Sequence, residues 1–269
     1  MISEHTPTVL SIAGYDPYGG AGIIMDTKTV HALGGYCVST ITAVTAQNAT
    51  GVKAVEAVSI SMLEAQLETL LEDTVIDAVK IGMLANTKTV ETVAKILHRY
   101  RLSNVILDPV LVSSSGKVLL EPQAVKVMVD KLFPLCRLIT PNLPEINALL
   151  GSDYQGTPKE VPKMAEALFA IGAKNLLLKG GHTVENEAAD YLVETSSITR
   201  FATPRIETSH THGTGCLLSS AIATYLADGL SLAQSIKSAK NFFYKKLKSS
   251  SALSLSYKRD TVKRKEPIF

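Results

Sequence analysis

Short apolar segments alternate with stretches of helical periodicity along most of this chain. The apolar segments are typical of strands buried on both faces of a sheet, and we predict strands over residues 8–13, 36–45, 78–81, 105–107, 138–139 and 175–178. Helices are predicted between them, over residues 22–34, 61–73, 87–100, 121–132 and 160–171. Strands that alternate with helices form a mostly parallel sheet covered on both faces. The pattern therefore predicts an α/β fold.

This alternation is interrupted late in the chain. Residues 190–193 and 198–201 resemble the two strands of an antiparallel hairpin. No linker, repeat or low-complexity segment divides the chain, so we predict a single domain over residues 1–248. Residues 249–269 are rich in serine and then basic, and we predict a poorly ordered tail there.

The composition excludes several classes of protein. Hydrophobic residues make up 46% of the chain, which is enough for a sizeable core. The sequence has neither a basic-then-apolar leader nor an apolar run of membrane-spanning length, so we expect a cytoplasmic protein without a membrane partner. Three widely spaced cysteines, Cys37, Cys136 and Cys216, predict reduced thiols rather than disulfides or a metal site.

The net charge of +2 conceals an uneven distribution. Residues 237–269 hold ten of the 27 basic residues but only two of the 25 acidic ones. The body of the chain is therefore acidic, and we predict no nucleic-acid surface there.

A glycine-rich stretch, Ser209–Cys216, leads directly into an apolar helical run over residues 217–227. The backbone N–H groups of such a loop can point at one spot, which suits an anion. Cys216 falls in the first helical turn, where the helix dipole lowers the pKa of a thiol below about 8.5 and would let it accept a proton from a hydroxyl. The local sequence alone rather favours the alternative, a small core cysteine beside an ordinary turn.

The glycine loop after the first strand, Gly14–Gly22, invites two familiar interpretations, and both fail. A Walker A loop needs Lys and then Ser or Thr after its last glycine, but Gly20 and Ala21 stand there. A dinucleotide-binding loop needs a third glycine where this chain has Met25. The loop therefore argues against a P-loop enzyme and against a dinucleotide-dependent oxidoreductase.

Chemically capable side chains follow several predicted strands. They share a place near the carboxyl ends of the strands, where open α/β sheets bind ligands; they are Gln47, Met83, Asp108, Asn142, Glu145 and Lys179, to which Asp26 and the loop ending at Cys216 are added. We therefore predict one ligand site at this edge.

Seven stretches together resemble the ribokinase-like superfamily and, within it, the hydroxymethylpyrimidine and phosphomethylpyrimidine kinases of thiamine biosynthesis. They occur in the order found in that family: Ala13–Gly22 with Asp26, Thr45–Asn48, Lys80–Leu84, Asp108–Val110, Thr140–Glu145, Lys179–His182 and Thr211–Cys216. The resemblance implies a three-layer sandwich and a homodimer. It also implies Mg²⁺ and ATP-dependent transfer to the hydroxymethyl group of a pyrimidine and then to the resulting phosphate.

The resemblance also implies roles for individual residues. Gly213, Thr214 and Gly215 would form the anion hole, with Cys216 in the place where most sugar kinases carry an aspartate base. Asp108 and Glu145, with Asn142, would hold Mg²⁺ near the nucleotide phosphates. Lys179, Asn142 and Gly181 would bind ATP. The pyrimidine site would comprise six residues: Gly14, Asp26, Thr45, Gln47, Met83 and Val110.

Several of these residues also fit ordinary structural roles. Asn142 before Leu143-Pro144-Glu145 fits a helix cap, a lysine after a strand can be a surface residue, and Met83 can be a core residue. His210 and His212 look like a metal pair but lack further ligands, so we predict hydrogen-bonded loop residues.

Other functions stay open. A pyridoxal or pyridoxine kinase shares the loop and the cysteine, although Gln47 favours a pyrimidine because an amide both donates and accepts hydrogen bonds. Tyr15 and Tyr18 stand where the family usually has small residues. A non-catalytic ligand-binding protein is therefore the third possibility.

Overall fold

The computed structural model describes residues 5–48, 50–113, 115–180, 187–208 and 212–249. The described strands form one nine-stranded sheet in the order β3-β2-β1-β4-β5-β6-β7-β8-β9. Six neighbouring strands are parallel: β1 (Thr8–Tyr15), β2 (Tyr36–Asn48), β4 (Ala78–Ile81), β5 (Val105–Leu107), β6 (Leu138–Ile139) and β7 (Leu176–Leu178). The predicted α/β fold with a mostly parallel sheet is confirmed.

Antiparallel strands flank this parallel block at both edges. On one side β3 (Gly51–Ala57) pairs with the far end of β2. On the other side β8 (Glu187–Glu194) and β9 (Ser197–Pro204) form the hairpin that the sequence predicts. The sequence analysis missed β3 and the extension of β2 to Asn48, whose side chains alternate between half-buried and exposed.

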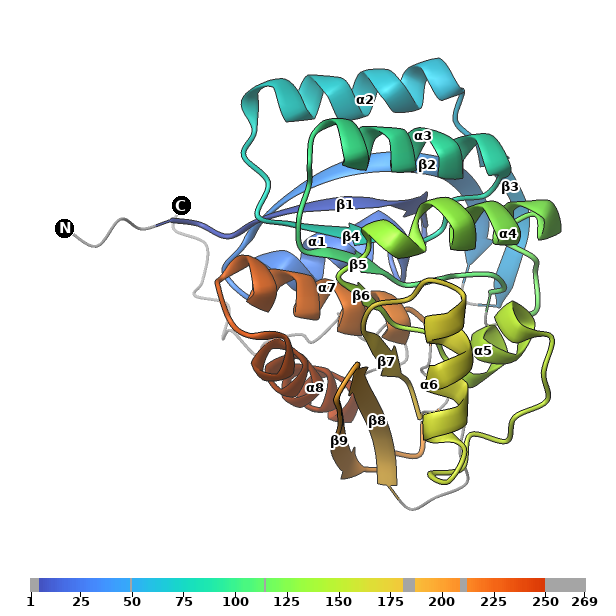
Figure 1. The fold of residues 1–269 in the computed structure, drawn as a ribbon. Coiled ribbons are helices and arrows are strands. Elements are labelled where there is room, and N and C mark those ends of the chain that lie inside the picture. Colours follow the sequence, from blue (N-terminus) through green and yellow to red (C-terminus); the bar gives the residue numbers. More distant parts are fainter. Residues whose placement is uncertain (1–4, 49, 114, 181–186, 209–211, 250–269) are drawn as a thin grey trace.

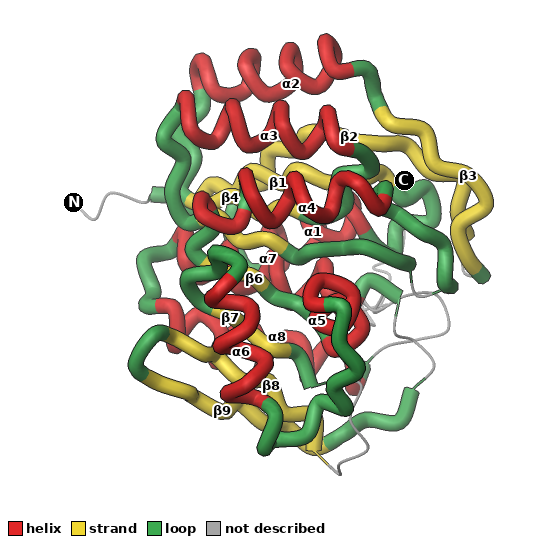
Figure 2. Tube along the Cα trace, turned by 45° about the vertical axis from the view of Figure 1, so that its right-hand side comes forward, coloured by secondary structure: helices red, strands yellow, loops and turns green. Residues whose placement is uncertain are grey.

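Helices cover both faces of the sheet (Figure 1). On one face lie α2 (Ile60–Asp73), α3 (Thr87–Arg99) and α4 (Pro122–Lys131), which are stacked side by side in both views (Figure 2). The same core cluster includes α5 (Leu143–Leu150) and α6 (Val161–Ala170), and a short 3-10 helix spans Phe133–Leu135. The opposite face is covered by α1 (Gly22–Ala32), α7 (Thr214–Ala227) and α8 (Leu232–Lys248).

The central strands divide their side chains between two hydrophobic clusters. In β1, Val9 packs toward α7 and α8, whereas Leu10 packs toward α2 and α3. Similarly, Ile106 and Leu107 of β5 belong to opposite clusters. Successive side chains of a strand point to opposite faces, so a strand between two helical layers is mostly apolar. This explains the short, uninterrupted apolar segments of the sequence.

One helix, α8, was missed by the sequence analysis. Helix α8 is rich in lysine, but it buries Leu232, Ser235, Ile236 and Ala239 along one face, at helical spacing. It begins with a capping box between Ser231 and Gln234, a signal that could have been found in the sequence. Helix α5 also begins with a capping box.

The predicted tail begins at Ser249, which follows α8, and its remaining residues, 250–269, lie outside the described residues. Across the described part of the chain, no helix combines the length and the apolar character needed to span a membrane.

Candidate active site

A cavity lies at the carboxyl ends of the parallel strands, where the sequence places the ligand site. Most of the predicted site residues line it: Gly14, Thr45, Gln47, Met83, Asp108, Val110, Asn142, Glu145, Lys179, Gly213, Thr214, Gly215 and Cys216. Two predicted residues are not among them. Asp26 lies outside the cavity lining, and Gly181 lies outside the described residues.

The glycines in the turn that begins α7 leave its backbone open to close approach by a ligand. Gly213 is the N-cap and has a φ of 80°, a conformation that strains residues with a side chain. A Cβ on Gly215 would lie 2.9 Å from Oδ2 of Asp108. The first N–H groups of a helix have no partner within it, and Gly213, Thr214 and Gly215 line the cavity. The turn can therefore present backbone donors to an anion.

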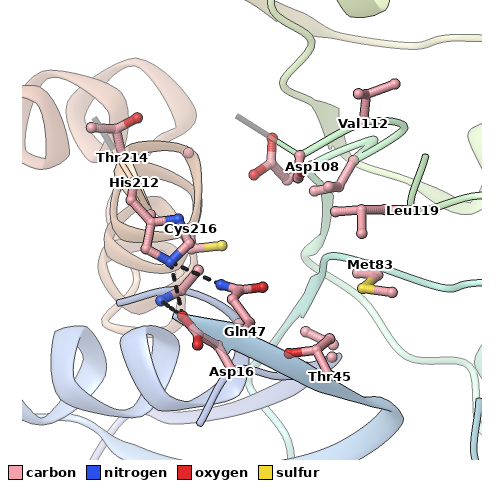
Figure 3. A pocket seen from close by; sticks show the side chains of 18 of the residues that line it. Asp16, Thr45, Gln47, Met83, Asp108, Val112, Leu119, His212, Thr214 and Cys216 are labelled. Atoms are coloured by element: carbon pink, nitrogen blue, oxygen red, sulfur yellow. Dashed lines mark hydrogen bonds and ion pairs between the residues drawn. The ribbon is translucent and has the colours of Figure 1, made fainter. Parts of the chain in front are cut away.

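Cys216 lies in the first turn of α7, and its sulfur points toward the cavity (Figure 3). Burial raises the pKa of this thiol to about 11; Lys80 opposes the increase, whereas Asp26 and Asp108 add to it. The sequence-based expectation of a lowered pKa is therefore wrong for this arrangement of residues. The helix N-terminus was visible in the sequence, but the burial of the thiol, which is the main cause of the increase, was not.

Lys179 joins the two carboxylates that the sequence assigns to a metal. Its ammonium nitrogen lies 2.7 Å from Oδ1 of Asp108 and 3.9 Å from Oε2 of Glu145. Although burial opposes the charge, these carboxylates raise the pKa of Lys179. Burial raises the pKa of Glu145 to about 7, despite the nearby ammonium. The three side chains thus form a nearly buried, charged cluster.

Asn142 acts as the N-cap of α5. Its Oδ1 accepts a hydrogen bond from the N–H of Glu145 at 2.9 Å, and Oε2 of Glu145 accepts one from the N–H of Asn142 at 2.8 Å. The capping interpretation is confirmed for this residue. The cap also fixes the carboxylate of Glu145 at the edge of the cavity.

The charged cluster fits a magnesium ion. Asp108 and Glu145 offer carboxylate oxygens, and the ammonium beside them shows that this position already stabilises a cation. No described group of three or more His, Cys, Asp or Glu side chains could hold a metal ion. Two protein carboxylates suit Mg²⁺, which keeps several waters and shares its ligands with phosphates.

The other end of the cavity is more apolar. Met83, Val110, Val112 and Leu119 line it together with Gln47. Figure 3 shows Met83, Val112 and Leu119 across the cavity from the amide of Gln47. An aromatic ring fits between apolar side chains and one polar amide that fixes its orientation.

Asp26 does not reach the cavity. Its carboxylate is fully buried and accepts hydrogen bonds from Lys80 Nζ at 2.8 Å and from Ser11 and Ser220, each at 2.6 Å. Both carboxylate oxygens are therefore engaged beneath the site, between α1, α7 and the sheet. Direct contact with a pyrimidine, which the resemblance implies for Asp26, does not agree with this geometry.

The cavity residues that were missed as site residues include Asp16, Lys80 and His212. Lys80 had a visible signal, a lone charge in the apolar strand β4. His212 was predicted to be a hydrogen-bonded loop residue, and this is confirmed by its contacts with Asp16 and Gln47. Its neighbour His210 lies outside the described residues.

The fold and the site are those of an α/β phosphotransferase, and comparison with known proteins identifies the family. A family model described as phosphomethylpyrimidine kinase matches residues 16–262. The chain is 43% identical to the hydroxymethylpyrimidine/phosphomethylpyrimidine kinase of Escherichia coli (strain K12), over 92% of this chain and 93% of that protein. The chain belongs to the phosphomethylpyrimidine kinase family.

Solved structures agree with this assignment. A phosphomethylpyrimidine kinase from Clostridium difficile 630 has a TM-score of 0.79 and 36% identity, covering 89% of this chain and 99% of that one. An ADP complex of Bacillus subtilis pyridoxal kinase has a TM-score of 0.86 and 31% identity, covering 94% and 96%. The similar structures therefore include kinases named for two different substrates, phosphomethylpyrimidine and pyridoxal.

Proposed function

We propose that this protein transfers the terminal phosphoryl group of ATP to hydroxymethylpyrimidine and then to its monophosphate, in thiamine biosynthesis. One observation carries the proposal: a single cavity is lined by apolar side chains and the amide of Gln47, by the glycine turn of α7 and by the cluster around Lys179. The acceptor and the phosphate donor would therefore meet beside Cys216. The kinase relatives and the ADP complex support this assignment.

Transfer of a phosphoryl group depends mostly on positioning and on stabilising negative charge. The backbone N–H groups of Gly213, Thr214 and Gly215 would stabilise the group in flight, and Lys179 would move from Asp108 to a phosphate oxygen. Mg²⁺ held by Asp108 and Glu145 would neutralise phosphate charge and offset the carboxylate charge that raises the pKa of Cys216. Cys216, as thiolate, would take the proton of the acceptor hydroxyl.

The thiolate form of Cys216 depends on nearby positive charge. Lys80 is fully buried, lines the cavity and lowers the pKa of Cys216 against the effect of burial. Lys80 would therefore stabilise the reactive form without touching the acceptor.

A second candidate is phosphorylation of pyridoxal, because a pyridoxal kinase is among the similar structures. The amide of Gln47 favours the pyrimidine, since it can both donate to a ring nitrogen and accept from an amino group. The discriminating experiment measures ADP release with Mg-ATP and each of three acceptors: hydroxymethylpyrimidine, its monophosphate and pyridoxal. Turnover of both pyrimidines supports the proposal, and turnover of pyridoxal alone overturns it.

Two further parts of the proposal have their own tests. Dependence on Mg²⁺ predicts that EDTA abolishes ADP release and that added Mg²⁺ restores it. A homodimer, which the family resemblance favours, predicts twice the mass of one chain in light scattering.

A further inference from the structure

Two glycine loops from opposite ends of the chain lie in direct contact at the cavity. One loop follows β1, and the other precedes α7. A Cβ on Gly213 would overlap the carbonyl oxygen of Gly20, and a Cβ on Gly20 would lie 2.5 Å from Cδ2 of His212. A side chain on Gly213 would therefore separate the loops, and a side chain on Gly20 would displace the His212 ring. The loop nearest the acceptor end is therefore packed against the anion-binding turn.

A side-chain bridge joins the same two loops. Nε2 of His212 lies 2.9 Å from Oδ2 of Asp16. The Asp16 carboxylate also accepts hydrogen bonds from the backbone N–H groups of Tyr18, Gly20 and Ala21, at 2.9, 3.1 and 2.9 Å. Asp16 therefore holds its own loop in shape and, at the same time, holds His212.

The hydrogen bonds to Asp16 all favour its ionised form. Burial raises the pKa of Asp16, but the hydrogen bond from His212 and those from backbone N–H groups outweigh it and lower the pKa below the ordinary value. An ionised carboxylate can only accept a hydrogen bond. The ring nitrogen that faces Asp16 must therefore carry a proton.

That same ring nitrogen faces Gln47, as Figure 3 shows. Nε2 of His212 lies 3.0 Å from the amide nitrogen of Gln47, and a flip of this amide exchanges its nitrogen with its oxygen. A ring nitrogen that donates its proton to Asp16 has no lone pair left to accept from an amide NH₂. The ring N–H therefore favours the orientation in which the Gln47 amide turns its oxygen to His212 and its NH₂ group toward the bound ring.

We propose that Asp16 and His212 form a positioning pair that aligns the acceptor with the phosphoryl donor. The pair joins the acceptor loop to the turn of Gly213, and through the N–H of His212 it orients the amide of Gln47. Gln47 then donates to a ring nitrogen of the acceptor, while its oxygen can still accept from a neighbouring amino group. This role rests on the proposed function, because it concerns the same acceptor site.

The kinetic test uses His212→Phe, which keeps a ring but removes both hydrogen bonds. We expect the KM for hydroxymethylpyrimidine to rise at least tenfold and kcat to fall, with the KM for Mg-ATP changed less than twofold. His98→Phe, an exposed position on α3, is the matched control and should match wild type. Thermal unfolding of both variants shows whether the fold is retained.

A substrate analogue distinguishes two possible roles of His212, which are to orient the amide of Gln47 and to hold the two loops together. The analogue is a pyridine in which a CH group replaces the ring nitrogen to which Gln47 would donate. Wild type should prefer the pyrimidine at least tenfold in kcat/KM, and His212→Phe should lose most of that preference. If His212→Phe lowers both rates by the same factor, or leaves both unchanged, the proposal is overturned.

A spectroscopic test does not depend on turnover. In protein with ¹⁵N-labelled histidine, the His212 signals, assigned by their loss in His212→Phe, should report a proton on Nε2. Asp16→Asn should shift or remove the Nε2 proton signal, because an asparagine does not require a donor there. A wild-type ring protonated only on Nδ1 would overturn the proposal. If wild type fails to phosphorylate any pyrimidine yet shows the Nε2 proton, the proposed function fails and the contact itself stands.

Discussion

The buried pair of Lys80 and Asp26 offers the sharpest test of how this site is supported. Both side chains are inaccessible to solvent, with Nζ and Oδ2 separated by 2.8 Å. Although burial opposes the charge, Asp26 raises the pKa of Lys80. Lys80→Met keeps most of the volume but leaves a buried carboxylate without its cation. Removing one partner of such a pair costs about 3–5 kcal/mol, so we expect the free energy of unfolding to fall by this amount.

The matched comparison is the double variant Lys80→Met with Asp26→Asn. It removes both charges. Ser11 and Ser220 bond different oxygens of Asp26, so with asparagine one hydroxyl can donate to the amide oxygen and the other can accept from the amide NH₂. Because no unpaired charge remains, the double variant should recover at least about 2 kcal/mol relative to Lys80→Met. Urea unfolding followed by circular dichroism measures all variants, provided that the m-value is constant.

This comparison also distinguishes support of the fold from contact with substrate. If Asp26 supports the fold, Asp26→Asn lowers stability more than it changes the KM for pyrimidine. A loss below about 1 kcal/mol for Lys80→Met, or a double variant no more stable than Lys80→Met, would refute the reasoning. A large rise in KM for Asp26→Asn at unchanged stability would instead favour direct contact with the pyrimidine.

Three further predictions concern the chemistry of the cavity. Cys216→Ser should leave the melting temperature unchanged but slow kcat at least tenfold; an unchanged kcat would exclude Cys216 as the base. Gly215→Ala should lower turnover at least tenfold while the protein stays folded, because the new Cβ meets Asp108 at 2.9 Å; a fully active variant would place the phosphoryl group elsewhere. Without Mg²⁺, the Glu145 contribution to stability should decline by up to about 3 kcal/mol between pH 4.5 and 7, because the unfolded chain loses this proton first and the folded pKa is raised from 4.5 to about 7. Glu145→Gln keeps the capping box and should remove this decline of the free energy of unfolding, measured by urea unfolding between pH 4.5 and 7. If the variant and wild type show the same pH dependence, the raised pKa of Glu145 is contradicted.

Much of the fold was predictable because it depends on local patterns. A strand between two helical layers is mostly apolar, as β5 is. The strands β1 and β4 keep this pattern although each carries a buried polar residue, Ser11 or Lys80, that is paired with Asp26. The positions of Asp108 and Lys179 followed from the same reasoning, because parallel strands end at one edge of the sheet. Helix α8 was missed because its lysines hide a narrow apolar face.

The properties of the site that were not predictable depend on neighbours distant in sequence. Local sequence places Asp26 on α1, but not whether its carboxylate faces the cavity or the buried ammonium of Lys80. The pKa of Cys216 likewise depends on burial and on carboxylates from other elements, which outweigh the local helix dipole. Family resemblance could suggest roles for both residues, but their environments required the structure.

The glycines of the two loops show that a sequence motif cannot be explained from its own segment alone. Gly213 suits an anion-binding turn, and its φ of 80° agrees with that interpretation. However, position 213 must also be glycine because of packing, since a Cβ on Gly213 would overlap the carbonyl oxygen of Gly20. In the proposed function the same residue would thus serve both phosphate binding and the contact between the two loops. Gly20→Ala would place a Cβ 2.5 Å from Cδ2 of His212. It should therefore displace this ring and lower kcat/KM for hydroxymethylpyrimidine, although Gly20 is not part of the anion-binding turn.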